Sequence, residues 1–255
     1  MEKNIILAGV GGQGILSIAF VIDNAALDAG FQFKQAEVHG MAQRGGAVQS
    51  NLRYGDSEIY SDIIPTGRAD LILSVEPLEV LRYWHFLRPG GWVVTSVTPY
   101  VNIPDYPETD DLLAELAAFD NIVMVDTAHI AKAAGNLRAQ NMAAVGAASE
   151  LLDFSENQLL SFVEKLFARK GEKIVAVNQR AFKYGRAAGL FFRGLVDGGI
   201  PRLAAIKLSA KLAAETIDPE YAGAWAEALG ADENKLETVL AEKEAVACDQ
   251  AAAFA

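Results

Sequence analysis

The chain has 255 residues, 51% of them hydrophobic, and a formal net charge of -11 at pH 7. This length accommodates one large α/β domain with an extension, and the acidic charge excludes a general nucleic-acid binder, because phosphate contacts need clustered Lys and Arg. No apolar run approaches the length of a membrane span, so we expect a cytoplasmic protein without a signal peptide or a membrane segment.

Cysteine and histidine usage argues against a metal or redox centre in this chain. Cys248 is the single cysteine, so the chain alone forms no internal disulfide and no cysteine-ligated iron–sulfur cluster. The three histidines, His39, His85 and His129, do not stand at metal-ligand spacing from one another. We therefore expect no metal here, and any redox centre would belong to a partner.

The first half of the chain alternates between strand and helix patterns. Strands are predicted at 4–10, 31–38, 47–54, 71–74, 92–97 and 122–125, and helices at 15–29, 77–86 and 110–119. Pro89-Gly90-Gly91 is expected to break the chain before the fifth strand. This alternation is typical of an α/β fold with a Rossmann-like, mostly parallel sheet and flanking helices.

Alanine-rich amphipathic stretches replace the strand signals from Asn141 onward. They predict helices at 141–152, 155–169, 173–196, 202–215, 220–229 and 232–247. Gly198-Gly199-Ile200-Pro201 is the clearest break, so we expect a Rossmann-like domain over residues 1–197 and a C-terminal helical extension over 198–255. The extension has too little apolar surface for an independent core, and we expect it to serve assembly by lying on another subunit.

A glycine loop, Gly9-Val10-Gly11-Gly12-Gln13-Gly14, stands between the first strand and the first helix. Such glycines let the backbone approach a ligand closely, and the helix N-terminus offers free N–H groups to an anion. Glu37 stands 23 residues after Gly14, where nicotinamide dehydrogenases carry an acidic residue. A nicotinamide-dependent oxidoreductase therefore stays open, as does a role of the glycines in close packing alone.

The stretch from Val38 to Gly46 is too polar and glycine-rich for a helix after the second strand, and it is typical of a site loop. His39, Gln43 and Arg44 supply a titratable ring, an amide and a fixed cation. Gly45 and Gly46 allow backbone conformations that other residues avoid. The arginine is expected to hold a phosphate or carboxylate, or to tie down the loop through a salt bridge.

Taken together, these motifs resemble the gamma-type subunit or domain of 2-oxoacid:ferredoxin oxidoreductases. The resemblance rests on the glycine loop, on Glu37-Val-His-Gly-Met-Ala-Gln-Arg-Gly-Gly-Ala-Val48 and on Leu52-Arg53-Tyr54-Gly55. The stretch from Asn141 to Ala147 is similar to the Asn-x-x-x-x-Gly-Ala helix start of the family. The form of residues 39–46 is similar to the indolepyruvate (arylpyruvate) type, and the resemblance covers roughly residues 1–190.

The resemblance implies a division of labour between two subunits. A large partner would carry thiamine diphosphate and 4Fe–4S clusters, and the complex would oxidatively decarboxylate an arylpyruvate to an acyl-CoA and pass two electrons to ferredoxin. This chain would be inactive alone, would hold no cofactor by itself, and would help shape the site for coenzyme A, the co-substrate. A stand-alone NAD(P)-dependent oxidoreductase and a non-catalytic assembly subunit are the alternatives.

The same resemblance implies which residues contact a ligand or lie at the subunit junction, although it assigns none of them a catalytic step. These candidates are Gly11, Gly12, Gln13, Gly14, His39, Gln43, Arg44, Gly45, Gly46 and Asn141. Arg44 is the expected anchor for a negatively charged group, with His39 and Gln43 as orienting groups. Asn141 has a second reading as the cap of its own helix, because asparagine is favoured at that position.

Overall fold

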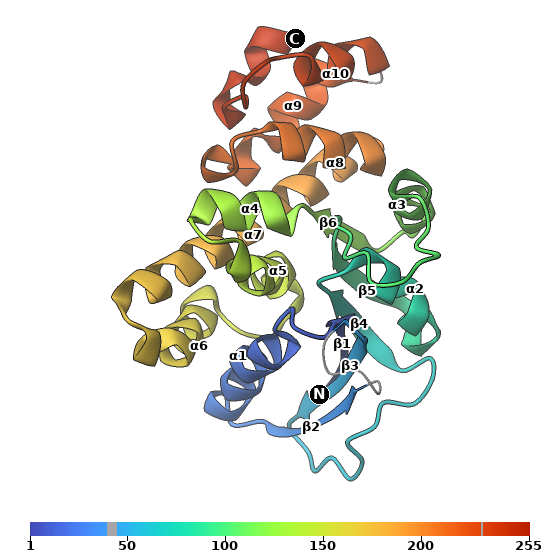
Figure 1. Cartoon of the computed structure of the whole chain (residues 1–255), viewed down its shortest axis with the longest axis vertical. Coiled ribbons are helices and arrows are strands. Elements are labelled where there is room, and N and C mark those ends of the chain that lie inside the picture. Colours follow the sequence, from blue (N-terminus) through green and yellow to red (C-terminus); the bar gives the residue numbers. More distant parts are fainter. Residues whose placement is uncertain (40–44, 231) are drawn as a thin grey trace.

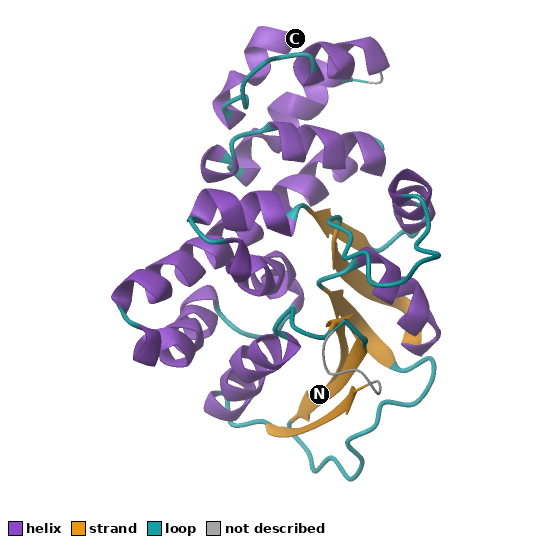
Figure 2. Cartoon of the chain, viewed as in Figure 1, coloured by secondary structure: helices purple, strands orange, loops and turns teal. Residues whose placement is uncertain are grey.

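The structure is a computed structural model of the chain and describes residues 1–39, 45–230 and 232–255. A twisted six-stranded sheet stands between layers of helices, and the C-terminal helices stack beyond it, far from the N-terminus (Figures 1 and 2). The expected α/β class is confirmed.

The sheet is mostly parallel, with one strand reversed. Its strands are β1 (Glu2–Val10), β2 (Gln32–His39), β3 (Ala47–Gly55), β4 (Ala69–Ser74), β5 (Leu87–Ser96) and β6 (Ile122–Val125). Their order in space is β2-β3-β1-β4-β5-β6. β3 pairs antiparallel with both of its neighbours, while β1–β4, β4–β5 and β5–β6 are parallel pairs.

Helices cover both faces of the sheet, which explains the continuous apolar run of β1. Ile5, Ile6, Leu7 and Ala8 are all 0% exposed. One face is covered by α1 (Ile15–Asp28), α5 (Gln140–Ala148) and α7 (Glu172–Asp197), and α6 (Glu156–Phe167) packs on α1 (Figure 1). The other face is covered by α2 (Pro77–Tyr83), which lies next to α3 (Thr109–Ala117).

Helices α5 and α7 cross at unusually close range, because glycines stand at the contact. A Cβ atom added to Gly185 would lie 2.0 Å from the carbonyl oxygen of Ala143, and one added to Gly146 would lie 2.0 Å from that of Phe182. No side chain fits at either position without moving a helix. This crossing holds α5 and α7 together on the same face of the sheet.

The helices predicted after residue 141 are found within a few residues, with one exception. α8 (Arg202–Lys211) and α9 (Ala222–Leu229) match, but α10 (Glu233–Leu240) ends earlier than expected. A short helix that the sequence reading did not predict, α4 (Thr127–Ala134), follows β6.

The prediction that Pro89-Gly90-Gly91 breaks the chain before the fifth strand is wrong. Strand β5 begins at Leu87, so these three residues lie within it. The β4–β5 pairing shifts register between Ala69 and Leu71, and the β5–β6 pairing starts only at Val93. Pro89 therefore lies on a stretch with no β6 neighbour, where its missing N–H costs no ladder hydrogen bond.

The C-terminal extension packs on α7 and α4 of its own chain. Within it, Trp225 is 0% exposed and its Nε1 donates to the carbonyl oxygen of Cys248 at 2.7 Å. His129 of α4 makes a hydrogen bond of 2.9 Å through Nε2 to the carbonyl oxygen of Leu212. The domain boundary at residue 198 and the assembly role of the extension stay predictions.

Two features are absent from the described residues. None of their helices combines the length and apolarity that crossing a bilayer requires. Nor does that part of the chain hold three or more His, Cys, Asp or Glu side chains grouped to bind a metal ion.

Candidate functional site

The glycine loop and the Gly45-Gly46 turn meet at the carboxyl edge of the parallel strands. Gly11 donates its N–H to the carbonyl oxygen of Gly46 at 2.8 Å, and Gly45 donates to the carbonyl oxygen of Gly11 at 3.2 Å. Two motifs that are far apart in the sequence therefore form one surface. In open α/β sheets this edge is where ligands bind.

A small hollow lies over the glycine loop, where α1 begins. Gly12 and Gly14 have φ angles of 105° and 83°, which side chains rarely tolerate, and Gly14 is the N-cap of α1. The hollow has a volume of about 260 Å³ and is lined by Val10, Gly11, Gly12, Gly14, Ile15, Leu16, Glu37 and Val48. The N-terminus of a 14-residue helix at this point favours a negatively charged group.

The carboxamide of Gln13 points inward and braces the sheet. Its Oε1 accepts the N–H of Val10 at 2.7 Å, and its Nε2 donates to the carbonyl oxygen of Val75 at 3.3 Å. Both polar atoms of the side chain therefore join the end of β1 to the residue that follows β4. This geometry favours a bracing role for Gln13 over direct contact with a ligand.

Asn141 supports the glycine loop from below. The residue is 6% exposed, and its Nδ2 donates to the carbonyl oxygen of Gly14 at 3.4 Å. α5 begins at Gln140 with Ala139 as its N-cap, so Asn141 lies inside the first turn and does not cap the helix. The predicted link between Asn141 and the site thus runs through the backbone of the loop.

A further polar residue reaches the site from the segment between β5 and α3, residues 97–108, here called the strap. Asn102 of the strap donates Nδ2 to the carbonyl oxygen of Gly45 at 2.8 Å. The sequence motifs give Asn102 no role. No local pattern points to it, since the contact joins residues 57 positions apart.

The strap is tied down beside two buried carboxylates. Glu76, 1% exposed, accepts the N–H of Tyr100 at 3.2 Å and the hydroxyl of Tyr106. Glu79, also 1% exposed, pairs with Arg82, while burial raises the pKa of the Glu79 carboxyl and the arginine opposes that rise. Glu76 joins the start of α2 to the strap, whereas Glu79 pairs within α2, and neither acid lines the glycine hollow.

Some of the predicted site residues lie outside the described part. Gln43 and Arg44 fall outside the described residues. His39 is described by its backbone, as the last residue of β2, opposite Val48 of β3. The structure therefore brings together Gly11, Gly12, Gln13, Gly14, Gly45, Gly46 and Asn141 from the predicted set.

Sheet topology disfavours the nicotinamide-dependent alternative. In the dinucleotide-binding fold the acidic companion follows the strand next to β1. Here β3 lies between β1 and β2, so Glu37 stands on the edge strand of the sheet, although it lines the glycine hollow. Glu37 therefore reaches the glycine hollow from across β3, an arrangement that the dinucleotide-binding fold does not have.

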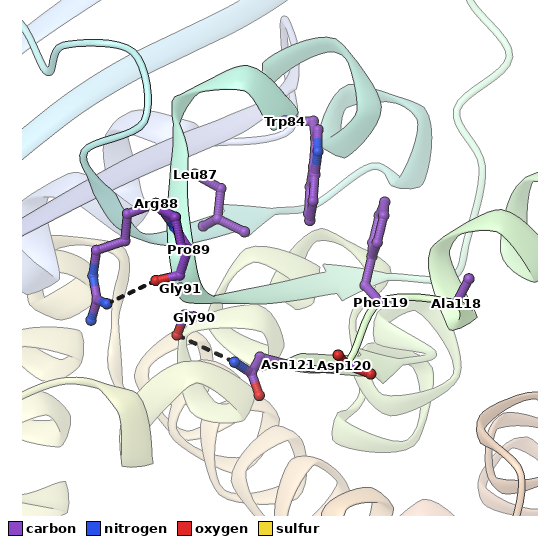
Figure 3. Close-up of a pocket in the computed structure, with 10 residues that line it drawn as sticks. All are labelled: Trp84, Leu87, Arg88, Pro89, Gly90, Gly91, Ala118, Phe119, Asp120 and Asn121. Carbon is purple, nitrogen blue, oxygen red and sulfur yellow. Dashed lines mark hydrogen bonds between the residues drawn. The ribbon is translucent and has the colours of Figure 1, made fainter.

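A larger hollow of about 460 Å³ lies at the opposite edge of the sheet, where β5 begins and just before β6 (Figure 3). Trp84 and Phe119 stack on its rim with ring centroids 3.9 Å apart and an interplanar angle of 8°. Asn121 donates Nδ2 to the carbonyl oxygen of Gly90 at 3.2 Å in the same hollow (Figure 3). We place the candidate site at the glycine edge, because ligands of open α/β sheets bind at the carboxyl ends of strands.

Comparison with known proteins identifies a family. A family model described as pyruvate ferredoxin/flavodoxin oxidoreductase matches residues 4–188. The chain is 37% identical over 204 residues to an indolepyruvate oxidoreductase subunit IorB from Thermococcus kodakarensis, which covers 76% of this chain and 99% of that protein. It is 36% identical over 198 residues to the subunit of the same name from Methanothermobacter thermautotrophicus, with 74% and 98% covered.

Solved structures agree with this result. A 2-oxoglutarate:ferredoxin oxidoreductase from Magnetococcus marinus, solved with 2-oxoglutarate, coenzyme A and succinyl-CoA bound, matches with a TM-score of 0.59 and 25% identity; the match covers 74% of this chain and 31% of that one. A gamma subunit of a keto/oxoacid ferredoxin oxidoreductase from Geobacter sulfurreducens shares the fold, with a TM-score of 0.57, 24% identity, and 74% and 98% covered.

Proposed function

Because the chain belongs to the pyruvate ferredoxin/flavodoxin oxidoreductase family, we propose that it is the small subunit of an oxidoreductase that acts on an arylpyruvate of the indolepyruvate type. Two relatives named as indolepyruvate oxidoreductase subunits support the substrate class, since the match spans 99% and 98% of their lengths. The partner would be a large subunit that this chain does not contain.

The proposed reaction is the oxidative decarboxylation of the 2-oxoacid. Its carboxyl group leaves as CO2, the remaining acyl group is transferred to the thiol of coenzyme A with release of the thiol proton, and two electrons reach ferredoxin. Iron–sulfur clusters on the large subunit, when bound, would carry these electrons. Thiamine diphosphate on the large subunit, when bound, supplies the electron sink for the decarboxylation. The part of this chain is to bind and orient the acyl acceptor at the junction of the two subunits.

The observation that carries the proposal is the pairing of Gly11 with Gly45 and Gly46 at the carboxyl edge of the sheet. This pairing joins two segments, the glycine loop and the turn that follows Arg44 along the chain. The glycine loop permits a ligand to approach the backbone closely. The hollow of about 260 Å³ is smaller than the ~300–1,000 Å³ of pockets that enclose whole ligands. We therefore assign it one portion of coenzyme A, with the rest held by the large subunit.

Reconstitution with the large subunit tests the proposal. The complex should reduce ferredoxin or a redox dye with indolepyruvate, should require coenzyme A, and should yield an acyl-CoA detectable by mass spectrometry. Pyruvate and 2-oxoglutarate serve as competing substrates, and each subunit alone serves as the blank. A preference for either competitor would refute the substrate class, and turnover by this chain alone would refute the division of labour.

Arg44 distinguishes a role in coenzyme A binding from a role in assembly alone. A charge-assisted hydrogen bond is worth ~1.5–3 kcal/mol, so Arg44→Ala should raise the KM for coenzyme A by about one to two decades, and Arg44→Lys should restore part of this loss. Exposed Arg68, on the opposite edge of the sheet, provides the control Arg68→Ala. Unchanged kinetics in an intact Arg44→Ala complex would leave Arg44 as a loop brace, whereas lost association would favour the assembly role.

A further inference from the structure

One buried carboxylate, that of Glu76, holds the strap on both sides of Asn102. Glu76 accepts the N–H of Glu79 at 3.0 Å, which caps α2, and the N–H of Tyr100 at 3.2 Å. It also accepts the hydroxyl of Tyr106. Burial raises the pKa of Tyr106, so its phenol stays protonated and remains a donor. Two of the three groups that donate to this carboxylate therefore belong to the strap, on either side of Asn102.

Asn102 carries this anchorage to the glycine site. Its Nδ2 donates to the carbonyl oxygen of Gly45 at 2.8 Å, while the N–H of the same glycine donates to Gly11 at 3.2 Å. Gly45 has a φ angle of 76°, in the left-handed region. The turn is thus held by the strap through its carbonyl group and by the glycine loop through its N–H group.

We infer that Asn102 is a positioning residue for the acyl-acceptor site, acting through the backbone of Gly45. It fixes the Gly45-Gly46 turn against Gly11 and so fixes the spacing of the two site segments. The role in positioning coenzyme A rests on the function proposed above, whereas the role in holding the turn does not.

The chain offers a matched control for this inference. Asn121 also donates its Nδ2 to a glycine carbonyl oxygen, that of Gly90, at 3.2 Å (Figure 3). It lies at the opposite edge of the sheet, in the hollow beside Trp84. Asn121→Ala therefore removes the same kind of hydrogen bond without touching the glycine site.

Amide hydrogen exchange of the full chain, with glycine-selective 15N labelling, tests the holding role. Loss of one hydrogen bond should speed exchange of the Gly11 and Gly45 N–H groups about three- to tenfold in Asn102→Ala. Asn102→Asp, which keeps the size of the side chain but removes the donor, should have the same effect. Wild-type exchange at both glycines in Asn102→Ala, or equal acceleration in Asn121→Ala, would overturn the inference.

Kinetics of the reconstituted complex test the positioning role. Asn102→Ala should raise the KM for coenzyme A about three- to tenfold and leave kcat at saturating coenzyme A near the wild-type value, because the residue orients the site without joining the chemistry. Asn121→Ala should change neither. A fall in kcat at unchanged KM would overturn the positioning role. If the wild-type complex needs no coenzyme A, the proposed function fails, and the exchange experiment still decides whether Asn102 holds the turn.

Discussion

Asn141 lies so close beneath Gly14 that position 14 has no room for a side chain. Its Nδ2 donates to the Gly14 carbonyl oxygen at 3.4 Å, and a Cβ atom added at position 14 would stand 2.5 Å from that nitrogen. The start of α5 therefore determines how the β1–α1 turn passes over the sheet. Two substitutions distinguish this packing constraint from backbone strain.

Alanine at position 14 should destabilise the fold more than alanine at position 12. Both glycines have positive φ angles, but nothing lies within 4 Å of a Cβ atom at Gly12. Gly12→Ala should cost only the left-handed conformation, about 1–2 kcal/mol. Gly14→Ala should carry a similar backbone strain and, in addition, a steric clash between the new Cβ atom and Asn141. Its urea midpoint should therefore fall further than that of Gly12→Ala.

The double variant Gly14→Ala, Asn141→Ala separates the two contributions. It should regain the part of the loss that comes from the steric contact and keep the part that comes from the φ angle. Strict additivity of the two single changes would show that Asn141 does not press on the loop.

The crossing of α5 and α7 predicts a loss of stability on substitution that an exposed helical glycine should not show. Gly185→Ala places a Cβ atom 2.0 Å from the Ala143 carbonyl oxygen, so the helices must separate. We expect a loss of about 3 kcal/mol or more, or no soluble protein. Gly223→Ala in α9, where nothing lies within 4 Å, should instead stabilise by about 0.5–1 kcal/mol, since alanine is the better helix former. A small loss at Gly185 would mean that α7 is free to shift.

Buried Asp23 of α1 makes stability depend on pH. It is 7% exposed, its Oδ1 has no hydrogen-bond partner among the described residues, and burial raises the pKa of its carboxyl to about 7 from 3.8. The folded state therefore holds this proton at pH values where the unfolded chain has lost it. Its contribution to the free energy of unfolding should fall by at most about 4 kcal/mol as pH rises from about 4 to about 7. Above pH 7 this contribution should stay low.

Asp23→Asn removes the titrating group at nearly the same volume. Urea unfolding should show the variant more stable than wild type at pH 8, with the difference shrinking toward pH 5. Asp62→Asn, at an exposed position, should show no such trend. A difference that is the same at both pH values would assign the effect to packing and not to the proton.

The sequence predicted most strands and long helices, because each carried its own periodicity. It missed α4 although both ends of that helix are marked: Asp126 accepts the N–H of His129 at 2.8 Å as an N-cap, and Gly135 closes it with a φ of 106°. The helix has only 8 residues, and its buried face, Thr127, Ile130, Ala131 and Ala134, holds one large apolar side chain, so its periodicity is weak in the sequence. Capping residues were the better signal there.

At the site, the sequence predicted which segments carry candidate residues but not how these segments are held. The motifs around Gly11 and Gly45 were found because glycine patterns are local. The contacts of Gln13 with Val75 and of Asn102 with Gly45 depend on the order of strands in the sheet, which no local pattern records. For the same reason Glu37 looked like the companion of a dinucleotide site, before the position of β3 was known.

The last prediction concerns the C-terminal extension, where Cys248 reports on local opening. Its side chain is 0% exposed, burial raises the pKa of its thiol, and its carbonyl oxygen accepts Trp225 Nε1 at 2.7 Å. A disulfide reagent should therefore label native Cys248 far more slowly than a free thiol, because reaction needs both exposure and the thiolate.

Trp225→Phe keeps an aromatic ring but removes the donor, so labelling should accelerate about three- to tenfold. If the extension opens as a separate unit, the unfolding midpoint of the sheet domain, followed through Trp84 and Trp92, should stay in place. Trp84→Phe, on the rim of the distant hollow, should leave the labelling rate unchanged, with Trp92 then reporting on the sheet. If Trp225→Phe speeds labelling and also lowers the unfolding midpoint of the sheet domain, the extension and the sheet unfold together. The boundary at residue 198 would then not separate two cooperative units.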